Sequence, residues 1–105
     1  RARGPARRAR GNAMNLTRQQ VRVRYTGDVQ GVGFRYTVRK LATPLGVTGG
    51  VENLLDGSVQ MVAEATPDTL RLLLTQIHAS RLGAHIADEQ IAWGPAQGLA
   101  GFYYR

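Results

Sequence analysis

The sequence predicts an α+β domain in which two helices cover one face of a mostly antiparallel sheet. Segments with alternating apolar residues and segments with helical periodicity follow one another in the order strand, helix, strand, strand, helix, strand. The pair Asp56 and Gly57 separates the middle two strand segments, which is a strong hairpin signal. The 105 residues are enough for one compact domain and not for two.

The first strand and the first helix are joined by a glycine-rich loop. Residues 20–26 alternate between apolar and polar side chains, as in a strand with one buried face. The loop over residues 27–33 contains three glycines. A helical period then begins, and Pro44 and Gly46 end the helix or kink its last turn. Its apolar stripe consists of Phe34, Val38, Leu41, Ala42 and Leu45.

The second helix has the clearest local signals, and it follows a hairpin predicted from residues 47–55 and 58–64. Thr66 is its predicted N-cap, Pro67 suits the first helical position, and the charge of Asp68 favours the positive N-terminal end. The residues that recur at helical spacing on its buried face are Leu70, Leu73, Leu74 and Ile77.

Two weaker strands are predicted at residues 85–93 and 99–104, separated by Gly94 and Pro95. Right-handed crossovers that place both helices on one face of the sheet then give a ferredoxin-like βαββαβ sandwich with a short extra C-terminal strand. The aromatic residues near this end are expected to pack the final strands rather than to stack on bases or substrate; they are Trp93, Phe102, Tyr103 and Tyr104.

The charge of the chain is concentrated at its N-terminus. The formal net charge is +7, but residues 1–13 hold five arginines and no acid. Residues 14–105 hold nine basic and seven acidic side chains, a net charge of +2. We therefore expect residues 1–13 to be a disordered leader or tag, with a nucleic-acid-binding arm as the less favoured alternative, and residues 14–105 to be the functional domain.

The composition excludes several classes of site. The chain has no cysteine, which rules out disulfides and thiol nucleophiles and is consistent with a cytoplasmic protein. No run approaches the roughly 18 apolar residues that a membrane span requires. His78 and His85 are too isolated to form a metal site and are expected to be solvated, so we predict no metal or organic cofactor.

The loop over residues 27–33 is a candidate anion site because it joins a strand to the start of a helix. Glycines allow successive backbone N–H groups to converge, and the helix N-terminus adds partial positive charge. Arg35, in the first turn, has a planar guanidinium that can hold two phosphate oxygens. The spacing fits equally a tight strand–helix connection that needs glycine for backbone freedom, and Arg35 alone fits a solvated surface residue.

Two segments resemble the signatures of the acylphosphatase family. The loop and the first helical residues match the first signature, whose core is VQGV followed by Phe-Arg. The residues that carry this match are Gly27, Asp28, Val29, Gln30, Gly31, Val32, Gly33, Phe34 and Arg35. Residues 49–59 resemble the second signature, a strand that ends in an Asn (here Asn53) before an Asp-Gly turn. Arg35 and Asn53 are 18 positions apart, as the family pattern requires.

The resemblance implies a metal-independent hydrolase of acyl phosphates. In that family the loop amides and the signature Arg hold the phosphoryl group and the Asn positions the attacking water, so these roles fall on residues 27–33, on Arg35 and on Asn53. The expected partner is a small acyl phosphate, with inorganic phosphate or sulfate able to occupy the site, and the expected state is a cytoplasmic monomer. Without the resemblance, Asn53 fits equally a residue that helps to form the turn.

Two departures from the family pattern motivate an alternative function. Gly50 stands where the family usually has an aromatic residue, and Glu52 where a basic or small residue is common. A glycine leaves nothing to pack in the strand, and a carboxylate adds negative charge near the expected phosphate. The alternative is a non-catalytic phosphate-binding or regulatory module on the same fold. An RNA-recognition module ranks lower, because Arg22 and Arg24 offer charge without a stacking ring.

Overall fold

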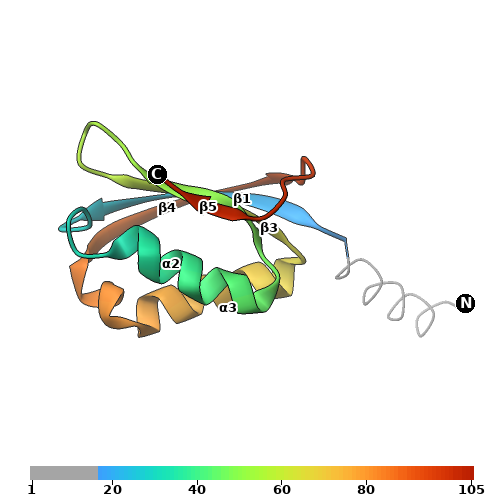
Figure 1. Cartoon of the computed structure of the whole chain (residues 1–105), viewed down its shortest axis with the longest axis horizontal. Coiled ribbons are helices and arrows are strands. Elements are labelled where there is room, and N and C mark those ends of the chain that lie inside the picture. Colours follow the sequence, from blue (N-terminus) through green and yellow to red (C-terminus); the bar gives the residue numbers. More distant parts are fainter. Residues whose placement is uncertain (1–16) are drawn as a thin grey trace, which may run out of the picture.

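The computed structural model describes residues 17–105, and its strands form one sheet with both α-helices on the same face (Figure 1). The expected leader over residues 1–13 lies outside the described residues. The elements in chain order are β1 (Gln19–Gly27), α2 (Phe34–Ala42), a 3₁₀ turn (Thr43–Leu45), β2 (Thr48–Asn53), β3 (Val59–Ala65), α3 (Pro67–Ala79), a second 3₁₀ turn (Arg81–His85), β4 (Ile86–Pro95) and β5 (Phe102–Tyr104).

The sheet has the strand order β4-β1-β3-β2-β5, which confirms the predicted ferredoxin-like βαββαβ arrangement with an added C-terminal strand. The β1·β3, β1·β4 and β2·β3 pairs are antiparallel, and β5 lies parallel to β2 at the edge. Asn53, the last residue of β2, pairs with Val59 across the hairpin. The hairpin and the loop between β1 and α2 therefore meet at one end of the sheet.

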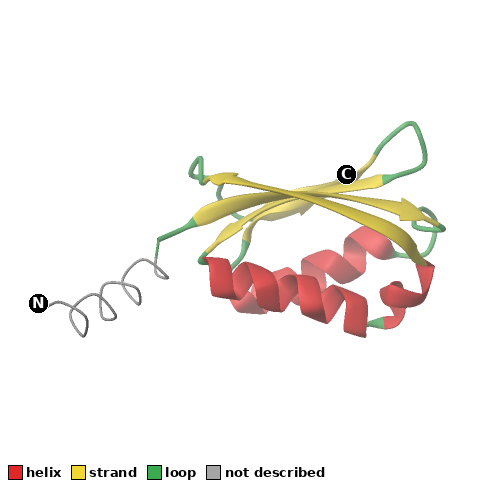
Figure 2. Cartoon of the chain, turned by 180° about the vertical axis from the view of Figure 1, so that it is seen from behind, coloured by secondary structure: helices red, strands yellow, loops and turns green. Residues whose placement is uncertain are grey.

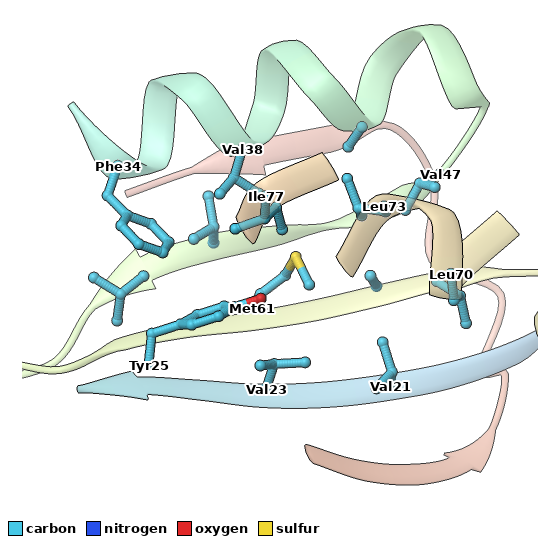
Figure 3. Close-up of a cluster of buried hydrophobic side chains, with 14 of the residues drawn as sticks. Val21, Val23, Tyr25, Phe34, Val38, Val47, Met61, Leu70, Leu73 and Ile77 are labelled. Atoms are coloured by element: carbon cyan, nitrogen blue, oxygen red, sulfur yellow. The ribbon is translucent and has the colours of Figure 1, made fainter. Parts of the chain in front are cut away.

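The sheet and the two helices form two layers, which Figure 2 shows from behind, and the core lies between them. Alternate residues of β1 point into it, as the sequence predicts, and α2 and α3 add their apolar stripes (Figure 3). The fully buried side chains include Val21, Val23, Tyr25, Val38, Met61, Leu70, Leu73 and Ile77. Within residues 17–105, no helix is both long and apolar enough to cross a membrane.

Local chemistry explains where the helices start and stop. Thr66 caps α3 as predicted, since its hydroxyl accepts a hydrogen bond from the N–H of Thr69 at 3.4 Å. The first helix is α-helical only to Ala42, because Pro44 has no N–H to donate and the chain tightens into a 3₁₀ turn that ends at the left-handed Gly46.

The strand boundaries differ from the prediction at both hairpin arms and near the C-terminus. β2 ends at Asn53 rather than at residue 55, because Asp56 accepts hydrogen bonds from the backbone and side chain of Ser58 and shapes a wider turn. Gly94 and Pro95 do not separate two strands but end β4, where Pro95 is tolerated because β4 is an edge strand. The break falls instead at residues 96–101.

Candidate active site

The loop between β1 and α2 contains two left-handed glycines and leads directly into the N-terminus of the helix. Gly31 and Gly33 are both left-handed, with φ of 80° and 75°, and Gly33 is the N-cap of α2. Within residues 17–105, no hydrogen bond pairs the N–H groups from Val29 to Arg35 with a protein acceptor. Left-handed turns that bring successive N–H groups together at a helix N-terminus form an anion-binding concavity. The loop thus offers unpaired donors to an anionic ligand.

Arg35 and Asn53 line the same hollow, of about 100 Å³, beside this loop. Both side chains are half-buried, one in the first turn of α2 and the other at the end of β2. Arg35 takes no part in the five ion pairs formed among residues 17–105. The hollow is completed by Val29, Gly31, Gly33, Phe34, Tyr36 and Tyr104.

Gln30 ties the loop to the hairpin that carries Asn53. Its side-chain amide donates to the carbonyl oxygens of Leu54 at 2.8 Å and of Ser58 at 2.9 Å. Leu54 directly follows Asn53, so the loop and the end of β2 are joined by two hydrogen bonds. Gln30 therefore joins the loop to the hairpin and does not itself line the hollow. Its position in the sequence does not reveal this role.

Contacts with the rest of the fold hold the other residues of the loop in place. Gly27 ends β1 beside a register shift, packed against the backbone of His85 and Ala87. The N–H of Asp28 donates to the carbonyl of His85 at 3.0 Å, while its carboxylate is exposed to solvent. Val29 is fully buried, and Val32 packs against the core. Of the seven predicted loop residues, only Val29, Gly31 and Gly33 line the hollow.

Arg81 contacts the loop from the 3₁₀ turn after α3, and no motif in the sequence indicates this. Its guanidinium donates to the carbonyl of Val32 at 2.8 Å and to the hydroxyl of Thr37 at 3.0 Å. In the sequence, Arg81 lies 49 positions from Val32 and 44 positions from Thr37. Only the packing of α3 beside α2 brings these groups together.

The chain resembles known proteins over nearly all of its described part. The acylphosphatase family model matches residues 21–103. The chain belongs to the acylphosphatase family. An acylphosphatase of Caldanaerobacter subterraneus subsp. tengcongensis is 42% identical over 76 residues, which span 72% of this chain and 84% of that protein. An acylphosphatase of Thermococcus kodakarensis is 37% identical over 87 residues, 83% of this chain and 96% of that protein.

A solved acylphosphatase structure also shares the fold. The crystal structure of acylphosphatase from Bacillus subtilis superposes with a TM-score of 0.77 at 28% sequence identity. The superposition covers 83% of this chain and 98% of that chain. The overall fold is thus shared with a member of the acylphosphatase family over almost the whole length of that protein.

The structure corrects the expectation that Gly50 leaves an unfilled place in this acylphosphatase sheet. The ring of Tyr103 on β5 covers Gly50 so closely that a Cβ there would lie 2.1 Å from the ring. Gly50 and Tyr103 are paired in the parallel register of β2 and β5. The neighbouring strand therefore provides the ring, and glycine is needed for the close approach of that ring.

Glu52 is likewise accommodated on the sheet face away from the helices. Its carboxylate lies 3.9 Å from the guanidinium of Arg105, which in turn lies over the ring of Tyr103, 4.9 Å from its centroid. As alternation predicts, Glu52 does not line the hollow that contains Asn53. The charge that seemed unfavourable in the sequence is paired with a cation.

Tyr25 and two histidines are the titratable groups of interest near this end of the sheet. Burial and the Glu89 carboxylate raise the pKa of Tyr25, whose ring packs on Phe34, so its phenol stays protonated. His78 is exposed, as expected, and His85 is half-buried. Each also has a carboxylate neighbour, which is Glu89 at 2.9 Å for His78 and Asp28 at 3.9 Å for His85. In the described part of the chain, no three His, Asp or Glu side chains gather as metal ligands.

Proposed function

We propose that this chain is an acylphosphatase that hydrolyses the carboxyl-phosphate bond of acyl phosphates to a carboxylate and inorganic phosphate. The observation that carries the proposal is the shared hollow, which Arg35 and Asn53 line together with loop residues whose N–H groups have no acceptor within residues 17–105. Family membership and acylphosphatase relatives such as that of Thermococcus kodakarensis support the activity. The roles of individual residues are inferred from their positions.

Arg35 and the loop amides hold the phosphoryl group. The guanidinium is cationic at any working pH and can donate two parallel hydrogen bonds to phosphoryl oxygens, while the amides of Gly31 and Gly33 meet the others. These donors are fixed before the substrate arrives, since the loop is tied down by Gln30. Stabilising the charge of the equatorial oxygens by fixed donors is the main requirement of phosphoryl transfer.

Asn53 orients the attacking water. Its amide can accept from the water and donate to a phosphoryl oxygen, which places the nucleophile beside the phosphorus atom. The water oxygen bonds to phosphorus as the bond from phosphorus to the acyl oxygen breaks, and that electron pair leaves on a carboxylate. A carboxylate is a stable anion, so departure needs no general acid. The water's proton passes to an oxygen of the transferred phosphate.

The alternative of a non-catalytic phosphate-binding module is not favoured. It rests on Gly50 and Glu52, and the structure fills the first position with Tyr103 and pairs the second with Arg105. We further propose that residues 14–105 form the functional domain of a cytoplasmic monomer whose site also accepts inorganic phosphate or sulfate. The absence of cysteine and the size of the hollow support this.

Benzoyl phosphate hydrolysis at neutral pH with EDTA present tests the proposal. We expect turnover by the wild type and a loss of about 10²-fold or more in Asn53→Ala. Gln60→Ala is the matched control, because it removes a half-buried amide from the neighbouring strand β3 without touching the hollow. Full activity in Asn53→Ala contradicts the water-positioning role. Folded wild type without turnover contradicts the activity and favours the binding module.

A further inference from the structure

Arg81, in the 3₁₀ turn after α3, binds the loop over residues 27–33, which we call the phosphate loop. One guanidinium nitrogen donates to the carbonyl of Val32 at 2.8 Å, and the other donates to the hydroxyl of Thr37 at 3.0 Å. The first acceptor is in the loop and the second is in the opening turn of α2. Arg81 itself does not line the hollow that contains Arg35 and Asn53. The planar guanidinium of Arg81 therefore connects the loop to the first turn of the helix.

The bond to Val32 determines where the next N–H points. No peptide bond among residues 17–105 is cis, so the carbonyl of Val32 and the N–H of Gly33 point in opposite directions across their shared peptide. With the carbonyl held against Arg81, the Gly33 N–H points to the other side of the loop. That N–H has no acceptor within the described residues, and Gly33 lines the hollow.

We propose that Arg81 is a positioning residue that holds the Val32–Gly33 peptide in the orientation that aims the Gly33 N–H at the phosphoryl group. The proposal rests on the proposed function of the loop as the phosphate site. Arg81 lies outside both signature segments. It prepares the site by holding the Val32–Gly33 peptide and does not contact the substrate itself.

The chemistry of the contact requires arginine, and the contact lies close to Gly33, whose left-handed φ of 75° already favours glycine. Two acceptors on different elements need two donors at a fixed separation, which the planar guanidinium supplies and a lysine ammonium does not. Arg81 also approaches so closely that a Cβ on Gly33 would lie 2.9 Å from its terminal nitrogen. A side chain at residue 33 would push the guanidinium away from the peptide that it holds.

The test compares Arg81→Met and Arg81→Lys with Arg71→Met. Arg71 is a matched control, since it is a surface arginine on α3 whose guanidinium lies over Trp93, remote from the loop. Two quantities are measured well below each variant's unfolding temperature. The first is the affinity for inorganic phosphate, followed through the ¹H–¹⁵N signal of Gly33. The second is the kcat and KM for benzoyl phosphate.

We expect Arg81→Met to weaken phosphate binding about 10-fold, to shrink the phosphate-induced shift of the Gly33 amide, and to raise KM with a smaller change in kcat; one lost decade is about 1.4 kcal/mol. Arg81→Lys, which keeps the charge, should bind phosphate less than threefold more tightly than Arg81→Met does. Arg71→Met should match the wild type in both measurements. Should Arg81→Met fail to fold, the lysine variant decides the question alone.

Wild-type phosphate affinity in a folded Arg81→Met overturns the proposal. Full recovery in Arg81→Lys overturns it as well, because charge alone would then suffice. A failure of the proposed hydrolysis is recognised separately: wild type that binds phosphate without turning over benzoyl phosphate rejects the activity, while the binding comparison still decides the role of Arg81.

Discussion

Two groups of consecutive backbone amides in this protein differ in whether the chain itself supplies an acceptor for them. At one end of the sheet, the amides of Gln97, Gly98 and Leu99 donate to the carboxylate of Glu64 at 2.6–3.0 Å. At the other end, the amides from Val29 to Arg35 have no acceptor within the described residues. The first group is filled by the chain itself, and the second is left for a ligand.

The difference shows how similar local geometry serves stability in one place and function in another. Glu64 is fully buried, and Gln20 donates a fourth hydrogen bond to it at 2.8 Å. Its bonds fix the segment that leads into β5, which carries Tyr104 to the hollow. The phosphate loop is fixed instead by Gln30 and Arg81, which bind carbonyl oxygens and side chains and leave the amides open.

Among variants at the end of the sheet that carries the phosphate loop, Arg35→Gln should have the largest effect. We expect kcat/KM for benzoyl phosphate to fall about 10²-fold or more, because the fixed cation that offsets phosphoryl charge is lost. The fold should persist, since Arg35 forms no ion pair within residues 17–105. Arg22→Gln, an exposed arginine of β1, is the control for charge alone. Equal losses in both variants would contradict a specific role for Arg35.

Among variants at the end of the sheet where backbone amides donate to Glu64, Glu64→Gln should have the largest effect. We expect it to lower stability and to leave the chemical step unchanged. A neutral amide cannot accept from three backbone donors as a carboxylate does, so we expect the free energy of unfolding to fall by about 2 kcal/mol. The melting temperature should drop by about 10 °C, measured by circular dichroism. The kcat of the folded fraction should stay near that of the wild type; a loss comparable to that of Arg35→Gln would blur the distinction between the two ends.

The same carboxylate makes stability depend on pH in a defined direction. Burial acts to raise the pKa of Glu64, but the hydrogen bonds from Gln97, Leu99, Gln20 and Gly98 together lower it below its ordinary value. A depressed pKa contributes stability above the unfolded value of about 4.3, and this contribution is lost as the pH falls through the lower folded value. Melting curves between pH 3 and 7 should show a smaller acid loss in Glu64→Gln; equal losses reject this assignment.

Gly33→Ala should reduce activity more than Gly31→Ala, although both glycines are left-handed. Either alanine costs about 1–2 kcal/mol of backbone strain. Only at Gly33 does the added methyl also meet Arg81, at 2.9 Å, whereas the space beside Gly31 is open. We expect kcat/KM to be lower in Gly33→Ala than in Gly31→Ala by about 10-fold. Equal activities in the two variants would show that the contact with Arg81 has no consequence.

The smallest effect on activity is expected at the pair of Gly50 and Tyr103, which does not line the hollow. Gly50→Ala should lower stability by about 1–3 kcal/mol, since its methyl would overlap the ring of Tyr103. Adding Tyr103→Ser should recover part of this loss, because it removes the overlapping ring. Chemical denaturation of the single and double variants measures the coupling. Simple additivity of the two losses would mean that the ring does not depend on the glycine.

The sequence was sufficient for those features that local patterns determine. Alternation in β1, the cap at Thr66 and the Asp-Gly turn predicted the element order, and the two signatures singled out Arg35 and Asn53. These two residues line one hollow because a loop and a hairpin end meet at the same end of the sheet.

What the sequence did not reveal depends on distant segments meeting. Arg81 lies 49 positions from the carbonyl that it holds, and Gln97 lies 33 positions from Glu64. The ring over Gly50 comes from β5, a three-residue strand whose parallel pairing with β2 no local pattern specifies. In each case the partner is chosen by tertiary packing, so periodicity and propensity hold no information about it.

A titration of the ¹⁵N-labelled wild type with inorganic phosphate tests the contrast between the open and the filled amides most directly. The account predicts saturable shifts at the amides of Gly31, Gly33 and Arg35, with little change at Gln97, Gly98 and Leu99, which already donate to Glu64. Shifts of equal size in both groups, or saturation without any change in the loop amides, would contradict it.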